Sequence, residues 1–124
     1  MTTTADRVRE LVQLVEAGKF LEAFEEFYAE DVVMQENGQA PYVGKAAARA
    51  KEEAFVSAIR TLHESRAASV IVADDRAAIN WHAEYTFADG SRLRFDQVAY
   101  QTWRDGRIVY ERFFYDPGTL ASAA

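Results

Sequence analysis

The chain has 124 residues, of which 49% are hydrophobic and 27% charged, enough for one globular domain with a core and a small internal cavity. Its formal net charge of -6 argues against nucleic acid or an anionic membrane surface as the main partner, because both repel an acidic protein. It contains no cysteine, which excludes disulfides, a thiol nucleophile and a cysteine-based metal site.

The first part of the chain predicts two helices. Thr4 is placed to cap a helix over about residues 5–17, whose apolar stripe consists of Val8, Leu11, Val12 and Val15. Gly18 follows where a glycine often ends a helix. A second helix over about residues 20–28 has an aromatic side and an acidic side, and we interpret the acidic side as a solvent-exposed face.

The next segment predicts a short strand, a turn, a third helix and a further strand. The strand covers residues 31–37, and the chain turns at residues 38–41, which contain glycine and proline. The helix runs from about residue 45 to 62 with an alanine-rich apolar stripe, and the strand after it covers residues 67–72.

Three long strands follow, over residues 76–87, 92–103 and 107–115, and they are rich in aromatic and β-branched residues. The pairs Asp89-Gly90 and Asp105-Gly106 separate them. Both pairs are strong hairpin signals, because glycine accepts the positive φ that a tight turn requires.

The order of elements predicts an α+β fold, with a curved, mostly antiparallel sheet wrapped around three helices. Such a cone-shaped α+β barrel has a mouth that is a natural ligand site. We expect a single domain over residues 1–124, structured from about residue 5 to 117, with a frayed tail after Pro117.

Two segments carry a family resemblance: residues 27–34 (FYAEDVVM), with Gly44 before a helix, and Asp105-Gly106-Arg107-Ile108. They resemble the SnoaL-like branch of the nuclear transport factor 2-like superfamily. That superfamily includes polyketide cyclases, ketosteroid isomerase, limonene epoxide hydrolase and scytalone dehydratase, together with binding proteins that catalyse nothing. The resemblance extends over about residues 7–117, and because its motifs are structural it implies the fold more than the chemistry.

The register of each hairpin decides which side chains share a face, because side chains alternate across a strand. A two-residue loop at Asp89-Gly90 pairs Glu84 with Phe95 and so places both on one face. This face also contains Asn80, His82, Gln97 and Ala99. The opposite face contains Ile79, Trp81, Ala83, Tyr85, Val98 and Tyr100.

The last strand is assigned from the second hairpin. A three-residue loop with a glycine bulge at Asp105-Gly106 places Glu111, Phe113 and Tyr115 on the face of Glu84. Ile108, Tyr110 and Phe114 then lie on the other face. Without the bulge the last strand turns over, and Phe113 and Phe114 exchange places.

The resemblance selects the face of Glu84 as the cavity wall, because the epoxide hydrolase and the isomerase place polar working residues at the positions of Glu36, His82 and Glu84. Glu36 matches the carboxylate with which ketosteroid isomerases remove a proton next to a carbonyl. Burial among apolar side chains would raise its pKa and suit it to act as a base near neutral pH. His82 would then be the acid or orienting group, and Glu84 would fix His82.

Several positions depart from the families' patterns. Ala99 occupies the position of the isomerase's oxyanion-hole acid, and Leu11 occupies the position of its helix-one tyrosine. Phe113 occupies the position of the last-strand aspartate of SnoaL-type cyclases. The alternative for Glu36, His82 and Glu84 is therefore a satisfied hydrogen-bond network that stabilises the sheet.

The expected substrate-binding residues line the same cavity, with Asn80 and Gln97 binding a substrate oxygen. The full set is Tyr28, Met34, Asn80, Phe95, Gln97, Trp103, Glu111, Phe113 and Tyr115. Tyr28 and Trp103 are alternatively plain core residues.

The opposite face predicts a homodimer packed sheet to sheet, through Trp81, Tyr85, Tyr100, Tyr110 and Phe114. An exposed aromatic patch of this extent is larger than monomers usually tolerate. The alternative, a C-terminal segment that covers the patch, is disfavoured because the tail after Pro117 is short and polar.

Two functions remain open. The first is an enzyme without a cofactor that performs isomerisation, cyclisation, dehydration or epoxide opening on a small hydrophobic oxygenated molecule. The second is a dimeric binding or scaffold domain without chemistry.

No metal ligands are expected, because the two histidines, His63 and His82, lack metal-site spacing. The chain shows no signal-peptide pattern and no apolar run of about 20 residues, so a cytoplasmic protein is expected.

Overall fold

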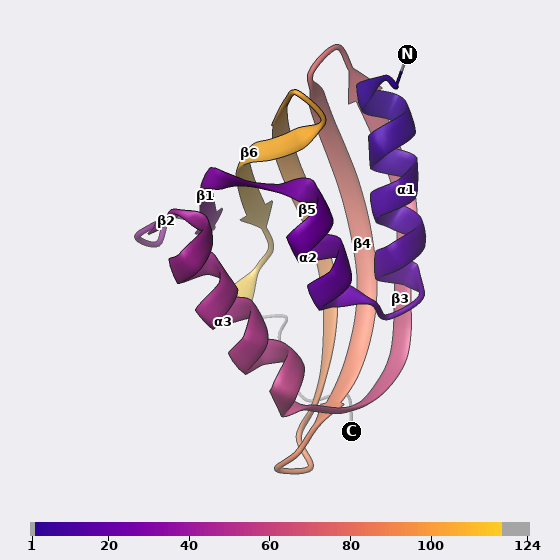
Figure 1. Cartoon of the computed structure of the whole chain (residues 1–124). Helices are drawn as coiled ribbons and strands as arrows, with labels where there is room; N and C mark the ends of the chain where they lie inside the picture. The colour runs from indigo at the N-terminus through magenta and orange to yellow at the C-terminus, as the bar shows by residue number, and fades with distance from the viewer. Residues whose placement is uncertain (1, 118–124) are drawn as a thin grey trace.

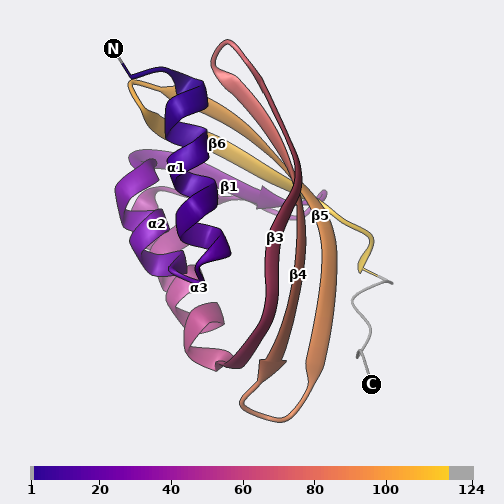
Figure 2. The same cartoon turned by 90° about the vertical axis from the view of Figure 1, so that its right-hand side faces the viewer.

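Three helices lie on one face of a curved six-stranded sheet in the computed structural model, which describes residues 2–117 (Figures 1 and 2). The elements are α1 (Thr4–Glu16), α2 (Phe20–Phe27), β1 (Tyr28–Glu36), β2 (Tyr42–Val43), α3 (Lys45–Ala58), β3 (Ile59–Ala73), β4 (Arg76–Phe87), β5 (Arg92–Arg104) and β6 (Arg107–Phe114). The strand order is β2-β1-β6-β5-β4-β3, with β1 and β6 parallel and the other neighbours antiparallel. The expected α+β fold is confirmed, and the expected frayed tail lies outside the described residues.

Helix α1 begins one residue earlier than predicted, because Thr3 and not Thr4 is its N-cap. The Thr3 hydroxyl accepts a hydrogen bond from the Asp6 backbone N–H, and the Asp6 carboxylate accepts one from the Thr3 backbone N–H, each at 3.1 Å. This reciprocal capping box satisfies two of the amide groups that a helix start leaves free.

Helix α3 ends at Ala58, four residues before the predicted end, and β3 continues directly from it. The Ala88 N–H donates to the Ala58 carbonyl at 2.8 Å, so pairing with the neighbouring hairpin begins where the helix stops. Strand β3 is 15 residues long and not the six-residue strand predicted over 67–72. Tertiary pairing therefore extends the strand through a segment that local pattern assigned to the helix.

The loop between β4 and β5 has three residues, 88–90, and not the two predicted. The Phe87 N–H donates to the Ser91 carbonyl at 2.8 Å, so residues 87 and 91 close the hairpin and not residues 88 and 91 as predicted. Glu84 consequently pairs with Arg94 and not with Phe95. This one-residue difference turns β4 over relative to the prediction.

For the hairpin between β5 and β6, the predicted loop was one residue too long. Its loop has two residues, with φ of +53° at Asp105 and +77° at Gly106, and Arg104 pairs directly with Arg107. The predicted glycine bulge is therefore wrong, but a register shift further along, at Thr102 and Trp103, restores the same alternation. Phe113 packs against the core and Phe114 is 44% exposed, as predicted for these two residues. Ile108, predicted on the outer face, is instead buried in the core, because it lies opposite Trp103 on the other side of the register shift.

The turned β4 determines the core. Its inward side chains Ile79, Trp81, Ala83 and Tyr85 are buried and face the helices. Their partners include Val8 and Leu11 of α1 and Phe24 and Phe27 of α2. In Figure 2 all three helices lie on this side of the sheet. Within residues 2–117, no helix is long and apolar enough to cross a membrane.

Substitution of Gly18 by alanine tests the α1–α2 connection. Gly18 has a φ of +79°, and an added Cβ would lie 3.0 Å from Leu62 Cδ2. We expect Gly18→Ala to lower the free energy of unfolding by about 1–2 kcal/mol, because an L side chain is strained in this region and Leu62 must move. Urea unfolding measures the change. Gly38→Ala is the control, because a Cβ there meets no atom within 4 Å; equal stability of the two variants would contradict the explanation.

Candidate functional site

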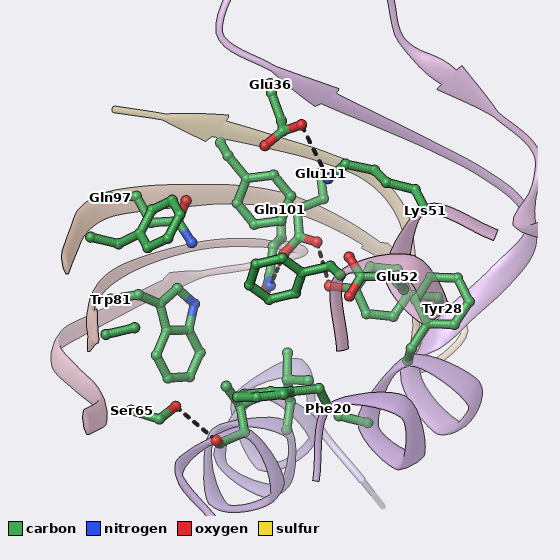
Figure 3. A pocket seen from close by; sticks show the side chains of 18 of the residues that line it. Phe20, Tyr28, Glu36, Lys51, Glu52, Ser65, Trp81, Gln97, Gln101 and Glu111 are labelled. Carbon is green, nitrogen blue, oxygen red and sulfur yellow. Dashed lines mark hydrogen bonds and ion pairs between the residues drawn. The ribbon is translucent and has the colours of Figure 1, made fainter. Parts of the chain in front are cut away.

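A cavity of about 160 Å³ lies between the three helices and the concave face of the sheet (Figure 3). Aromatic and aliphatic side chains form most of its wall: Leu11, Val15, Phe20, Ala23, Phe24, Phe55, Trp81, Ala83, Tyr85, Phe95 and Phe113. Polar side chains complete it: Tyr28, Glu36, Lys51, Glu52, Ser65, Gln97, Gln101 and Glu111. A dry cavity of about 150 Å³ in another protein accommodates benzene, so this one suits a single-ring molecule.

Glu111 of β6 is the most deeply buried acid of the cavity, with an exposed fraction of 1%. Its Oε1 accepts a short hydrogen bond from the Tyr28 hydroxyl, and its Oε2 accepts one from Gln101 Nε2 at 2.6 Å. Trp103 Nε1 donates to Gln101 Oε1 at 3.0 Å, which fixes the orientation of the Gln101 amide. The carboxyl group is therefore held in one position by a buried chain of four side chains.

Burial raises the pKa of Glu111 to about 7, because the charged form is removed from water. The hydrogen bonds from Tyr28 and Gln101 lower this pKa, and the nearby Glu52 carboxylate raises it. Among the described residues Glu111 has no ion-pair partner. Both protonation states of its carboxyl group are thus accessible near neutral pH, which is the requirement for a general acid or base.

A second set of charges lies around Glu36, the carboxylate predicted as the base. Lys51 of α3 contacts Glu36 Oε2 at 3.1 Å, and the Tyr115 hydroxyl donates to Glu36 Oε1 at 3.1 Å. Glu36 is thus neutralised by a lysine and not isolated among apolar side chains as predicted. Glu52, next to Lys51 on α3, has a pKa raised by its burial and makes no hydrogen bond within residues 2–117.

Six of the predicted site residues line the cavity: Tyr28, Glu36, Phe95, Gln97, Glu111 and Phe113. Met34 and Trp103 are buried in the core outside the cavity wall, with Trp103 supporting Gln101. Tyr115 lies beside the cavity, where its ring packs edge-on against Phe95.

The predicted placement of Asn80, His82 and Glu84 is wrong, because the three-residue loop at 88–90 turns them to the convex face. Glu84 forms ion pairs with Arg92 and Arg94 there, and it is buried beneath their side chains, not within the cavity. His82 lies between Arg66 and Asp96, and Asn80 donates to Asp96 at 2.8 Å. The alternative interpretation, a network that stabilises the sheet, describes His82 and Glu84 but not Glu36, which lines the cavity.

The same reversal corrects the predicted dimer surface. Trp81 and Tyr85 are each 7% exposed and line the cavity. Tyr100 and Phe114 remain on the convex face, with exposed fractions of 37% and 44%. Tyr110 is half-buried and donates to Gln35 Oε1 at 3.1 Å.

Sequence reasoning missed Lys51, Glu52 and Gln101. The helical spacing of Ala48, Lys51, Glu52 and Phe55 places these side chains on one side of α3, and this signal could have identified the two charged residues. Gln101 follows Ala99 by two positions and thus shares its face. No group of three or more histidine, aspartate or glutamate side chains within residues 2–117 is placed to hold a metal ion.

Comparison with known proteins gives a family. The model of the SnoaL-like domain matches residues 1–115. No curated protein gives a significant match. A candidate SnoaL-like polyketide cyclase, alternatively carbohydrate phosphatase, from Mesorhizobium loti is 26% identical, with a TM-score of 0.80, covering 91% of this chain and 99% of that chain.

Two further solved structures share the fold at lower identity. IdmH, a candidate polyketide cyclase from Streptomyces antibioticus, is 19% identical with a TM-score of 0.73 and covers 94% of each chain. A protein with a ketosteroid isomerase-like fold from Catenulispora acidiphila, solved with trimethylamine, is 14% identical with a TM-score of 0.73, covering 90% of this chain and 88% of that chain. The match over residues 1–115 shows that this chain belongs to the SnoaL-like family.

Proposed function

We propose that the protein is an enzyme without a cofactor that transfers a proton on a small, mostly apolar, oxygenated molecule, with Glu111 as its general base. One observation carries this proposal: a carboxyl group with a pKa of about 7 lies at the wall of an apolar cavity without an ion-pair partner among the described residues. The carboxylate would accept a proton from a carbon next to a carbonyl group, as isomerisation or aldol-type cyclisation requires. The similar structure from Mesorhizobium loti, a candidate polyketide cyclase, supports this chemistry.

Tyr28 and Gln101 have supporting roles in the proposal. Their hydrogen bonds hold the carboxylate in place. Because a carboxylate accepts up to about four hydrogen bonds, its other lone pairs remain for a proton of the substrate. Glu36 and Lys51 would limit access to the cavity from the side of α3, since their ion pair joins α3 to β1.

A second candidate function is a binding domain without chemistry. The observation that favours it is that both Glu111 oxygens already accept hydrogen bonds, as in a purely structural network. Binding without turnover across a panel of single-ring enones, β-keto compounds and epoxides would select this function.

The catalytic proposal is tested on that panel with Glu111→Gln. The amide can keep both contacts, because Tyr28 can accept from its nitrogen and Gln101 can donate to its oxygen. We expect turnover to fall by a factor of about 10²–10⁴ with ligand binding retained. The wild-type rate should rise with pH around a midpoint near 7, since the carboxylate is the active form. Glu84→Gln on the convex face is the control; equal loss in both variants would refute the role of Glu111.

The raised pKa of Glu111 also predicts a pH dependence of stability. The unfolded chain releases this proton around its ordinary pKa of 4.5, whereas the folded protein holds it until about 7. Stability contributed at this position is therefore full at low pH and is lost as pH rises through 7. Relative to Glu111→Gln, the wild type should lose about 2–3 kcal/mol between about pH 5 and pH 8 in urea unfolding. Parallel curves for the two proteins would contradict the buried, titrating carboxyl group.

We also propose that the convex face binds a second copy of the chain. Ile71 of β3, Val98 and Tyr100 of β5 and Phe114 of β6 are exposed there, with Val98 directly opposite Phe114. Charged side chains of both signs adjoin them: Glu64, Arg66, Arg92, Arg94 and Asp96. A surface with both signs can be complementary to itself under two-fold symmetry.

Light scattering with size-exclusion chromatography tests the dimer. We expect the wild type to have twice the monomer mass and Phe114→Glu to have the monomer mass, because a buried unpaired carboxylate opposes association. Val43→Glu is the control, because Val43 is 69% exposed on β2, at the other edge of the sheet. A monomeric wild type would overturn the proposed interface.

A further inference from the structure

The side chain of Asn37 contains a buried amide nitrogen without a hydrogen-bond partner. Asn37 lies in the turn between β1 and β2 (Figure 1). Among the described residues its Nδ2 is the one buried side-chain nitrogen or oxygen that has no partner. The Oδ1 of the same amide accepts a hydrogen bond from the Tyr115 N–H at 3.0 Å. Since buried polar atoms are almost always paired, this half-paired amide group requires an explanation.

The turn brings the amide carbon of Asn37 close to the next backbone nitrogen. The Gln39 N–H donates to the Glu36 carbonyl at 3.0 Å, so residues 36–39 form a β-turn. The φ of Asn37 is +49°, and Gly38 is not among the residues with a positive φ. This combination is that of a type II′ turn, in which the ψ of the first central residue is about −120°. At that angle the Gly38 nitrogen nearly eclipses the Asn37 Cβ, as it does in a five-membered succinimide ring.

The backbone nitrogen of Gly38 is available as a nucleophile. Its N–H makes no hydrogen bond within residues 2–117, and Gly38 is exposed, with open space where a Cβ would stand. The Asn37 carbonyl of the same peptide group accepts a hydrogen bond from Arg112 Nε at 2.9 Å. A deprotonated peptide group carries much of its negative charge on this oxygen. The Arg112 guanidinium therefore promotes loss of the Gly38 proton.

The side-chain amide of Asn37 is prepared as the electrophile. Negative charge develops on Oδ1 when a nucleophile adds to Cγ, and the Tyr115 N–H already donates to this oxygen, as an oxyanion-hole donor does. Nδ2 makes no hydrogen bond to the described residues, so none is lost when the nitrogen leaves. Its departure also removes a buried, unpaired donor, which is costly in a folded protein.

We propose that Asn37-Gly38 is a site of self-modification, at which the folded protein converts Asn37 to a succinimide and then to aspartate and isoaspartate. The Gly38 nitrogen loses its proton to solvent and bonds to Asn37 Cγ. The Cγ–Nδ2 bond then breaks, and the nitrogen takes a proton from solvent and leaves as ammonia. Water opens the ring at either carbonyl, so the net reaction consumes one water and releases one ammonia. This site does not depend on the proposed function.

The modification would act beside the cavity. Asn37 directly follows Glu36, which lines the cavity. Tyr115 links the two residues, because its N–H donates to Asn37 and its hydroxyl donates to Glu36 Oε1 at 3.1 Å. Isoaspartate lengthens the backbone of this turn by one carbon. It therefore changes how Tyr115 and Glu36 meet next to the cavity.

Mass spectrometry of the full chain, incubated in mildly alkaline buffer, tests the site. Trypsin releases residues 20–45 as one fragment, whose mass distinguishes asparagine, succinimide and acid. We expect the folded chain to convert Asn37 about tenfold faster than the chain unfolded in guanidinium chloride, because only the fold supplies the contacts of Arg112 and Tyr115. Asn80, whose Nδ2 donates to Asp96 at 2.8 Å, is the internal control and should stay unmodified. An equal or slower rate in the folded chain would overturn the proposal.

Three variants relate the rate to the geometry. Arg112→Gln should slow the reaction about tenfold in the folded chain and leave the unfolded rate unchanged. Arg107→Gln removes the same charge from an exposed position of β6 and should react like the wild type. Gly38→Ala should lose most of the reaction in both states, because the added Cβ crowds the nucleophilic nitrogen while the open space preserves the fold. A wild-type rate in folded Arg112→Gln would show that this geometry does not drive the reaction.

Discussion

The closure of the β4–β5 hairpin determines where chemistry can take place in this protein. The bond from the Phe87 N–H to the Ser91 carbonyl makes a loop of three residues, and every side chain of β4 takes its direction from that length. Trp81 and Tyr85 therefore enclose the cavity, while His82 and Glu84 join an ion-pair network on the convex face. With a loop one residue shorter, the cavity would have contained a histidine and a further acid, and the aromatic side chains of β4 would have faced outward.

The sequence was sufficient for the fold and for part of the cavity. Hairpin glycines, long aromatic strands and helical stripes identified the elements, and Glu111, Phe113 and Gln97 were placed correctly because the alternation of β5 and of the second half of β6 was right. Two errors in the second hairpin compensated: the predicted bulge at Gly106 is absent, and a register shift at Thr102 has the same effect. Aspartate-glycine pairs predict a turn, but they do not distinguish a two-residue loop from a three-residue loop.

The roles within the site could not be predicted from residue types. Glu36 and Glu111 are both glutamates on strands that line the cavity, yet Lys51 neutralises the first, and the second has only neutral hydrogen-bond donors. That difference depends on the side of α3 that faces the sheet and on the parallel pairing of β1 with β6. Tyr28 and Glu111 are 83 positions apart in the sequence, and their contact exists only in the folded structure.

The buried carboxyl group of Glu111 links stability to function. It is kept partly neutral by burial, at a cost to stability that increases with pH. A fully apolar cavity of this size would avoid this cost. A titrating acid, held by two neutral donors at the wall of a ring-sized cavity, is better explained by a ligand that requires it than by the stability of the fold.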